Sequence, residues 1–268
     1  MFREHPSPLQ VVQADIAYDR SVRTAVTGAF GVVNAVSLYV EHGSQTFRAV
    51  HIEAAARLAR LAREAGVSRL VHVSGIGADP RSRSTYIRSR GEGEDVVRTT
   101  FPGATIVRPA VMFGPGDAFL TPLTELMRTL PALPLFGAGE ARLQPAYVED
   151  VGEAIARIFD TPATDAPYEL GGPRIYTYRE LLKAIGDRIG RRPVLIPMPF
   201  AAWSTLAFMA EMLPRPPVTR NQVELMEIDS VASPACPGFR DLGIEPQDID
   251  VVLAAPARAS TGRPVGRP

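Results

Sequence analysis

Short β-rich runs alternate with helical patterns through the first half of the chain, and this alternation constrains the fold more than any other feature. The strands that we predict from valine, leucine and isoleucine content cover residues 9–15, 31–36, 69–74 and 104–108. The helices that we predict between them cover residues 21–28, 45–65 and 85–100. Strands that alternate with helices at this spacing form βαβ units, whose strands are parallel. The sequence therefore predicts an α/β fold with a doubly wound parallel sheet.

The second half of the chain has a different pattern, because prolines separate shorter elements there. Further helices are predicted at residues 148–159, 178–190, 200–213 and 219–227. We therefore expect one α/β domain over residues 1–160, a smaller C-terminal α/β cap over 161–256, and a disordered tail over 257–268.

Composition excludes several classes of protein. The 29 lysines and arginines balance 29 aspartates and glutamates, which argues against a nucleic-acid-binding protein that relies on overall basicity. Cys236 is the one cysteine, so a disulfide framework and a cysteine-based zinc site are excluded. The four histidines are scattered without the spacing of metal ligands, so we predict no metal site. The apolar stretches are shorter than a bilayer-spanning helix requires.

Polar residues follow each predicted strand of the first half. In order along the chain they are Asp15, Asn34 to Ser37, Ser74 and Arg108. Ligands of doubly wound sheets bind beyond the carboxyl ends of the strands, so this pattern favours a binding cleft. The alternative is that these positions are polar because loops generally are.

Tyr86 and Arg90 are four residues apart on a predicted helix and therefore share a face. Ser74 precedes this helix, at the end of a predicted strand. A tyrosine serves as general acid or base near neutral pH only if its pKa falls from about 10, and a neighbouring cation lowers that pKa. Tyr86 with Arg90 is thus a candidate catalytic pair, although tyrosine and arginine are also common on exposed helices.

Several segments resemble a known superfamily. Residues 72–79, 84–94 and 107–117 read HVSGIGAD, STYIRSRGEGE and VRPAVMFGPGD. They are similar to the active-site segments of extended and atypical short-chain dehydrogenases/reductases, the NAD-dependent epimerase/dehydratase superfamily with a Rossmann-like fold. Residues 141–151 and 168–173 narrow the resemblance to the group that contains the nucleotide-binding alpha-subcomplex accessory subunit of respiratory complex I.

The resemblance implies an NADP or NAD site and a role for individual residues. Ser74 and Tyr86 would face the nicotinamide, and Arg90 would stand in the place of the lysine that binds the nicotinamide ribose. Lys183 is the only lysine of this arginine-rich chain, so an arginine in place of that lysine at position 90 fits the chain's general preference for arginine over lysine. The other implied contacts are Asp15 and Ile16 at the adenine, Asn34, Ala35 and Val36 at the ribose and phosphates, Val73, and Pro109, Ala110, Val111 and Met112 near the nicotinamide amide.

The sequence departs from the superfamily at its start. Ser37 stands where relatives often have glycine, and no glycine-rich phosphate loop is present. Residues 9–15 match the third strand of the superfamily, so we expect a Rossmann-like sheet without its first two strands and interpret Met1 as an internal methionine of a truncated gene model. A genuinely shortened protein that binds no nucleotide is the alternative. Without those first two strands, the strand at 9–15 would either pair beside residues 32–36 or leave an apolar edge exposed.

Residues 200–213 form an apolar helix that is too short to span a membrane, since fourteen residues give about 21 Å. We expect a buried cap helix. The alternative is docking on a membrane surface or a partner subunit, which Trp203, Arg215 and Arg220 would favour.

Three functions remain open. The first is an NAD(P)-binding accessory protein that associates with respiratory or quinone-biosynthesis partners, in the cytoplasm or at the periphery of the inner membrane. The second is an active NAD(P)-dependent oxidoreductase or epimerase in which Tyr86 is the acid/base, Ser74 binds the carbonyl oxygen and Arg90 supports the charge. The third is a degenerate interaction protein without a cofactor.

Overall fold

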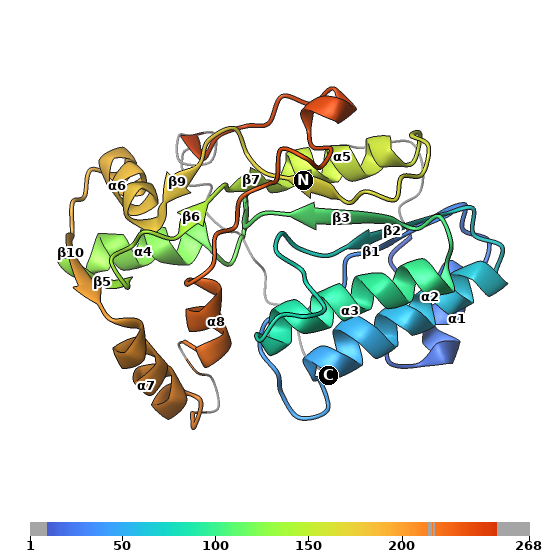
Figure 1. Cartoon of the computed structure of the whole chain (residues 1–268), viewed down its shortest axis with the longest axis horizontal. Helices are drawn as coiled ribbons and strands as arrows, with labels where there is room; N and C mark the ends of the chain where they lie inside the picture. The colour runs from blue at the N-terminus through green and yellow to red at the C-terminus, as the bar shows by residue number, and fades with distance from the viewer. Residues whose placement is uncertain (1–9, 214–215, 217, 251–268) are drawn as a thin grey trace. The chain divides into compact units, whose positions relative to one another are not determined.

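The computed structural model describes residues 10–213, 216 and 218–250, and the chain divides into two compact units. The first contains the residues up to Arg108 together with Ile155–Tyr168, and the second contains Pro109–Ala154 and the residues from Glu169 onward (Figure 1). Each unit thus draws on two separate stretches of sequence. The predicted tail at 257–268 lies outside the described residues, and the expected domain boundary near residue 160 stays a prediction.

A parallel sheet forms the centre of the first unit. Strand β1 (Gly31–Asn34) pairs in parallel with β2 (Arg69–Val73), which pairs in parallel with β3 (Thr105–Pro109). The strand order is β1-β2-β3-β8, and the chain passes from one unit to the other within β3 and β8 (Tyr168–Leu170). The parallel sheet predicted from the βαβ alternation is therefore confirmed.

Helices α1 (Asp19–Val26), α2 (Ala55–Glu64) and α3 (Thr85–Thr100) lie side by side along this sheet (Figure 1). Their apolar residues form one core with the strands, which includes Val22, Leu61, Leu70, Val97 and Ile106. Helix α3 has the predicted bounds. The predicted helix at 45–65 begins instead with a π-helical segment, η1 (Arg48–Ala54), before α2 continues it.

Two glycines let α3 approach its neighbours closely. A Cβ on Gly91 would overlap the backbone of Asp79 and Pro80, and a Cβ on Gly93 would overlap the carbonyl oxygen of His51 in η1. Any larger residue would push α3 away from the loop after β2 and from η1. The two glycines therefore fix the distance at which α3 presents its first turns to the rest of the unit.

The strand predicted at residues 9–15 is not formed over 10–15, and Leu9 lies outside the described residues. Residues 10–15 are exposed, and Asp15 begins a turn instead. Its backbone N–H donates to Ser21 Oγ, and its carboxylate accepts from the N–H of Ala17. Local side-chain hydrogen bonds of this kind compete with a sheet ladder. Within the described part of the chain, β1 consequently has β2 as its one strand neighbour.

The second unit is built from short elements around its own core. Strands β5 (Ala132–Phe136) and β10 (Val194–Met198) pair in parallel, and α4 (Leu120–Thr129) and α6 (Tyr178–Ile189) pack against each other. The remaining elements are β4 (Met112–Phe113), β6 (Arg142–Leu143), β7 (Ala146–Tyr147), β9 (Tyr176–Thr177), α8 (Arg220–Leu225) and the 3-10 turn η2 (Arg240–Leu242); α5 (Val148–Ile158) crosses the division between the units. Buried Phe113, Leu135, Leu181 and Ile185 lie at the centre of this core.

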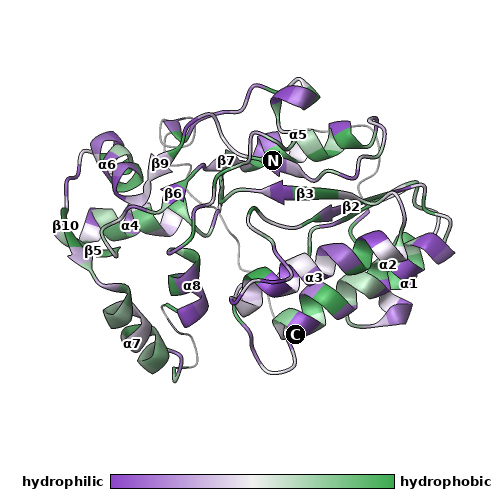
Figure 2. Cartoon of the chain, viewed as in Figure 1, coloured by the Kyte–Doolittle hydropathy of each residue, from purple (hydrophilic) through white to green (hydrophobic). Residues whose placement is uncertain are grey.

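Helix α7 (Phe200–Ala210) is apolar along its length, as Figure 2 shows, yet Ala207 is its one buried residue. Trp203 anchors its inner side, because the indole N–H donates to Leu135 O at 2.8 Å and the ring stacks on Phe136. Leu206, Phe208 and Met209 are exposed. The expectation of a buried cap helix is therefore wrong. No helix in the described residues combines the length and apolarity that crossing a membrane requires.

Candidate functional site

The first two turns of α3 bring Tyr86 and Arg90 together as their spacing predicts. The Arg90 guanidinium carbon lies 4.9 Å from the centre of the Tyr86 ring, in cation–π contact. Tyr86 is 6% exposed, because the ring of Tyr39 stacks on it at 5.9 Å and the ring of Phe47 meets it edge-on at 5.4 Å. The tyrosine thus lies in an aromatic enclosure with a cation at its face.

Burial dominates the ionisation of this tyrosine. Desolvation raises the pKa of Tyr86 to about 12, although the positive charge of Arg90 acts in the opposite direction. The sequence correctly indicated that Arg90 lowers the pKa of Tyr86. It did not indicate that Tyr39 and Phe47 enclose the ring, and this burial raises the pKa of Tyr86 by more than Arg90 lowers it.

The Arg90 guanidinium also lies close to Ser37 and Gly75. One of its Nη atoms donates to Ser37 Oγ at 2.7 Å, and a Cβ on Gly75 would lie 3.4 Å from the other. The guanidinium therefore lies beside the backbone that follows Ser74. Arg90 is 8% exposed, and its Nε is buried without a hydrogen-bond partner among the described residues.

Ser74 follows β2 directly, and its backbone N–H continues the ladder by donating to Val107 O at 2.7 Å. The residue is 4% exposed, and its Oγ is buried without a partner among the described residues. Buried hydroxyls in folded proteins are nearly always hydrogen-bonded, so this one is suited to a ligand atom.

His51 is a member of this cluster that sequence reasoning missed. Its Nε2 lies 3.2 Å from Leu38 N and 3.3 Å from Ser37 Oγ, and its Nδ1 lies 2.9 Å from Ser89 Oγ. The one sequence feature that indicates its place in the cluster is that it follows Phe47 by four residues and so lies on the same face of the predicted helix.

Asn34 and His72 face each other on neighbouring strands, where they are paired in register. The Asn34 side-chain amide donates to His72 Nδ1 at 3.0 Å, so the proton of the neutral imidazole is on Nε2. Burial, with a smaller contribution from Arg90, lowers the pKa of His72 to about 4. The resemblance placed Asn34 at the cofactor's ribose and phosphates. In the structure its side-chain amide instead donates to His72 on the neighbouring strand.

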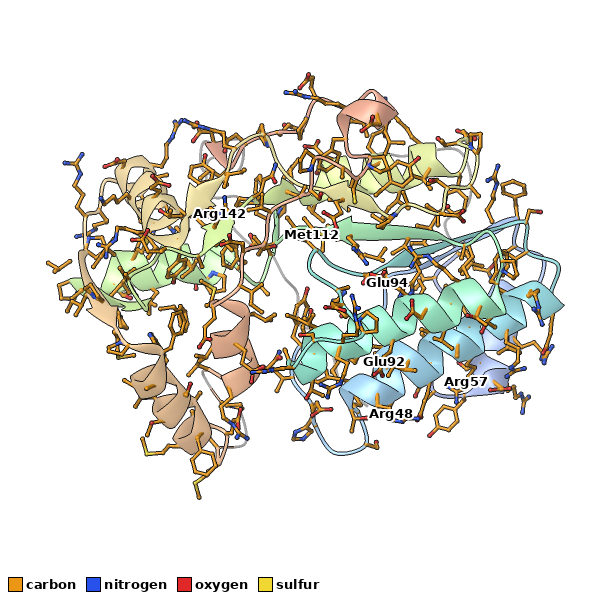
Figure 3. All side chains as sticks on the ribbon, viewed as in Figure 1. Arg48, Arg57, Glu92, Glu94, Met112 and Arg142 are labelled. Carbon is orange, nitrogen blue, oxygen red and sulfur yellow. The ribbon has the colours of Figure 1, made fainter. Side chains whose placement is uncertain are left out.

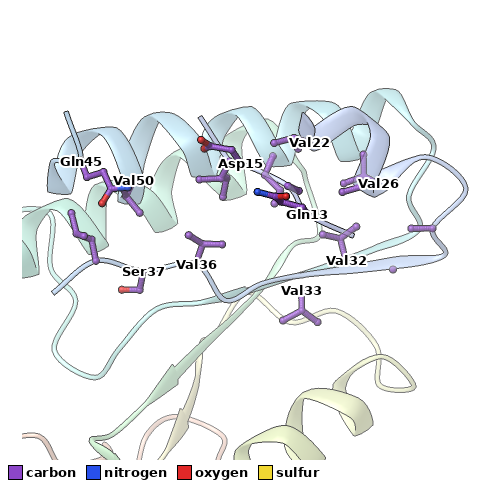
Figure 4. A pocket seen from close by; sticks show the side chains of 17 residues that line it. Gln13, Asp15, Val22, Val26, Val32, Val33, Val36, Ser37, Gln45 and Val50 are labelled. Atoms are coloured by element: carbon purple, nitrogen blue, oxygen red, sulfur yellow. The ribbon is translucent and has the colours of Figure 1, made fainter. Parts of the chain in front are cut away.

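A cavity of about 710 Å³ lies along β1 in the first unit. Figure 4 shows Val32 and Val36 pointing toward it while Val33 points to the opposite side of the strand. It brings together Asp15, Ile16 and Val36 of the predicted cofactor residues. The full lining is Gln13, Ala14, Asp15, Ile16, Val22, Ala25, Val26, Ala29, Gly31, Val32, Val33, Val36, Ser37, Leu38, Gln45, Val50 and Leu58.

Ser37 connects this cavity with the Tyr86 cluster, because it lines the cavity and accepts the hydrogen bond from Arg90. Ala35 is exposed just after β1, and Val73 pairs with Val107 in the sheet. Pro109, Ala110, Val111 and Met112 belong to the second unit, where Ala110 N–H donates to Leu170 O and Val111 O accepts from Ala146 N–H. The described residues contain no group of three or more His, Cys, Asp or Glu side chains placed to hold a metal ion.

Comparison with known proteins shows what the chain is similar to. Residues 2–118 match the NAD(P)H-binding family. The chain is 31% identical over 241 residues to the NADH-ubiquinone oxidoreductase 40 kDa subunit of Neurospora crassa, with 89% of this chain and 63% of that protein covered. It is 33% identical over 234 residues to subunit 9 of the NADH dehydrogenase [ubiquinone] 1 alpha subcomplex of Rattus norvegicus, covering 86% of this chain and 62% of the relative.

A bacterial enzyme is similar to a comparable degree. The ceramide reductase of Caulobacter vibrioides is 31% identical over 193 residues, which cover 71% of this chain and 60% of that protein. The chain therefore spans about three fifths of the length of these curated relatives.

Solved structures share the fold at lower identity. A nucleoside-diphosphate-sugar epimerase from Staphylococcus aureus matches with a TM-score of 0.69 and 20% identity, covering 91% of this chain and 82% of that one. The Citrobacter triphenylmethane reductase, solved with NADP(H), matches with a TM-score of 0.67 and 18% identity over 90% of this chain and 81% of that one. The chain thus has an α/β Rossmann-like fold, is similar to the NAD(P)H-binding family over residues 2–118, and is distantly similar to complex I subunits and ceramide reductase.

Proposed function

We propose that this chain binds NADP or NAD as an accessory-type protein and holds the dinucleotide mainly for structural purposes. The observation that carries the proposal is that two buried polar atoms of this cluster, Ser74 Oγ and Arg90 Nε, have no hydrogen-bond partner among the described residues. An unsatisfied buried donor costs about 1–3 kcal/mol, and a ligand hydrogen bond removes that cost. Similarity to complex I subunits supports a partner in a respiratory or quinone-related assembly, and the relatives from Neurospora and rat are named for such complexes.

The residues present fit a dinucleotide in two parts. The adenosine half suits the cavity along β1, where apolar valines offer a surface for the base and the exposed Asp15 carboxylate offers an acceptor for ribose hydroxyls. The nicotinamide half suits the neighbourhood of Ser74 and Arg90, with Ser37 between the two parts. When bound, the cofactor would supply hydride chemistry.

The ionisation of Tyr86 supports a binding role over turnover. A general acid or base works best with a pKa near the operating pH, whereas burial raises the pKa of Tyr86 to about 12. The enclosing ring of Tyr39 also limits access to it.

Equilibrium titration of NADPH fluorescence against the purified chain tests the proposal. We expect saturable binding that Ser74→Ala weakens about tenfold, which corresponds to one lost hydrogen bond. Thr99→Ala is the matched control, because Thr99 is an exposed hydroxyl residue of α3 that bonds within its own helix. Absence of saturable NADPH binding, or equal affinities of the two variants, would overturn the proposal.

The second candidate is an active NAD(P)-dependent oxidoreductase or epimerase. It is favoured by the contact between Tyr86 and Arg90 beside the Ser74 segment and by similarity to ceramide reductase. With a pKa of about 12, Tyr86 is protonated at neutral pH and could donate its proton to a carbonyl oxygen as a reduction proceeds. NADPH oxidation that depends on a carbonyl or quinone substrate and is lost in Tyr86→Phe would select this candidate, whereas full activity in that variant would exclude Tyr86 from the chemistry.

A further inference from the structure

His51 stands at the junction of two hydrogen-bonded arms in the first unit. One arm runs from Nε2 to Ser37 Oγ and on to Arg90, whose guanidinium donates to that oxygen at 2.7 Å. The other runs from Nδ1 to Ser89 Oγ, which donates to Tyr86 O at 2.8 Å. The imidazole thus connects both members of the Tyr86–Arg90 pair.

The partners fix which nitrogen carries the proton. Leu38 N–H donates to Nε2, so Nε2 is an acceptor and the imidazole proton is on Nδ1. Nδ1–H then donates to Ser89 Oγ, whose own proton goes to the Tyr86 carbonyl. At the other end Ser37 Oγ accepts from Arg90, and its hydroxyl proton points at Nε2, where it shares the nitrogen lone pair with the Leu38 N–H. Each hydrogen bond therefore has a defined direction.

The surroundings keep this imidazole neutral. Its ring stacks on Phe47 at 5.6 Å and meets the Tyr86 ring edge-on at 5.6 Å, and the residue is 5% exposed. Burial, followed by the positive charge of Arg90, lowers the pKa of His51 to about 3. A proton on Nε2 would also oppose the Leu38 N–H.

Backbone structure holds the imidazole in place as well. His51 lies in the π-helical segment η1. π-Helical geometry is rare in proteins overall, and where it occurs it is often at a functional site. The His51 carbonyl oxygen is packed against Gly93 of α3, so closely that no Cβ fits between them. The position of the ring relative to α3 is therefore set by the fold rather than by side-chain choice alone.

We propose that His51 is a positioning residue, whose Nε2 holds Ser37 so that Ser37 in turn holds the Arg90 guanidinium over the Tyr86 ring. The inference rests on the proposed function, because Arg90 placed in this way presents its buried Nε beside the Ser74 segment where the nicotinamide half would bind. Ser37 can serve as the acceptor for Arg90 because its own proton has a partner. Removing Nε2 leaves Ser37 free to rotate and Arg90 free to leave the ring.

Two substitutions at His51 separate the two arms. The side-chain amide of glutamine reaches the place of Nε2, and that of asparagine reaches the place of Nδ1. His51→Gln and His51→Asn both remove the aromatic ring and differ in which arm they can restore. A general loss of packing would affect the two variants equally. A positioning role through Nε2 predicts instead that only His51→Gln keeps the Arg90 guanidinium in its place over the Tyr86 ring.

NMR of the 15N-labelled arginine guanidinium groups in the ligand-free protein provides the readout, with Arg90 assigned through Arg90→Lys. We expect a slowly rotating Arg90 guanidinium with resolved Nη signals in the wild type and in His51→Gln, and averaged signals in His51→Asn and in Ser37→Ala. Ser37 is exposed, so its variant tests the same arm with little effect on folding. Averaged signals in the wild type, or a rigid Arg90 in Ser37→Ala, would overturn the inference.

NADPH titration then relates the arm to binding. We expect the Kd to rise about tenfold in His51→Asn and to stay within about threefold of the wild type in His51→Gln. If the wild type binds no NADPH, the proposed function fails while the ligand-free Arg90 signals still decide the role of His51. Rigid Arg90 signals in both His51 variants would show that the histidine does not position Arg90.

Discussion

The buried ion pair between α3 and β3 gives a sharp prediction for the stability of the first unit. Glu94 is 1% exposed and lies on the side of α3 that faces β3 (Figure 3). Arg108 donates to both of its carboxylate oxygens, from Nε at 2.9 Å and from an Nη atom at 2.8 Å, and Arg98 adds a longer contact at 3.5 Å. Glu94→Gln keeps the shape but turns an acceptor of this bidentate pair into a donor.

The magnitude follows from the burial of the carboxylate. Breaking a buried pair by removing one partner costs about 3–5 kcal/mol, and glutamine retains one acceptor, so we expect a loss near the lower end, about 3 kcal/mol. With a urea m-value of about 2–3 kcal/mol/M, the unfolding midpoint should fall by on the order of 1 M.

Urea unfolding followed by circular dichroism measures this loss. Glu64→Gln is the control, because Glu64 pairs with Arg60 and Arg23 on the surface, where its side chain is 40% exposed. We expect its midpoint to stay at the wild-type value. If Glu94→Gln unfolds at the same urea concentration as Glu64→Gln, the buried pair does not fasten α3 to the sheet.

Three further predictions concern pH and the second unit. Burial lowers the pKa of His72 to about 4 and that of His51 to about 3, so the unfolded chain binds protons below pH 6.5 that the folded chain does not. The stability is complete above pH 6.5 and should fall by about 1.4 kcal/mol per pH unit per histidine on acidification; equal urea midpoints at pH 7 and pH 5.5 would contradict this. Asp117 accepts from the N–H groups of Phe119 and Leu120 at the start of α4, so Asp117→Ala should cost about 1–2 kcal/mol in urea unfolding, and an unchanged midpoint would refute the cap. A Cβ on Gly172 would overlap Pro145 O, so Gly172→Ala should cost about 3 kcal/mol in the same assay, and wild-type stability would show that the close approach is absent.

Local patterns were sufficient to predict the elements with strong periodicity. Helix α3 occupies the predicted residues, and the parallel strands β1 to β3 lie within about two residues of their predicted bounds. The segment at 10–15 looked like a strand because it contains Val11 and Val12, but a strand needs a partner, and Asp15 starts a turn instead. Helix α4 and the β5–β10 pair were not predicted, because frequent prolines suggested connections there.

The candidate site was predictable only where its residues are close in sequence. Tyr86 and Arg90 are four residues apart on one helix, so their contact follows from helix geometry. The enclosure of Tyr86 by Tyr39 and the contact of His51 with Ser89 join residues that are distant in sequence, and no local pattern encodes them. The raised pKa of Tyr86 depends on that enclosure and was therefore not foreseen.

The central claim is that a dinucleotide binds with its nicotinamide half beside Ser74 and Arg90. Adding NADPH to the 15N-arginine-labelled protein tests it directly, because Arg90 Nε is buried without a partner in the described structure and its signal should respond to a new hydrogen bond. We expect the Arg90 Nε signal to shift saturably with NADPH while that of the exposed Arg81 does not move. An Arg90 signal that stays unchanged at saturating NADPH would contradict the proposed site.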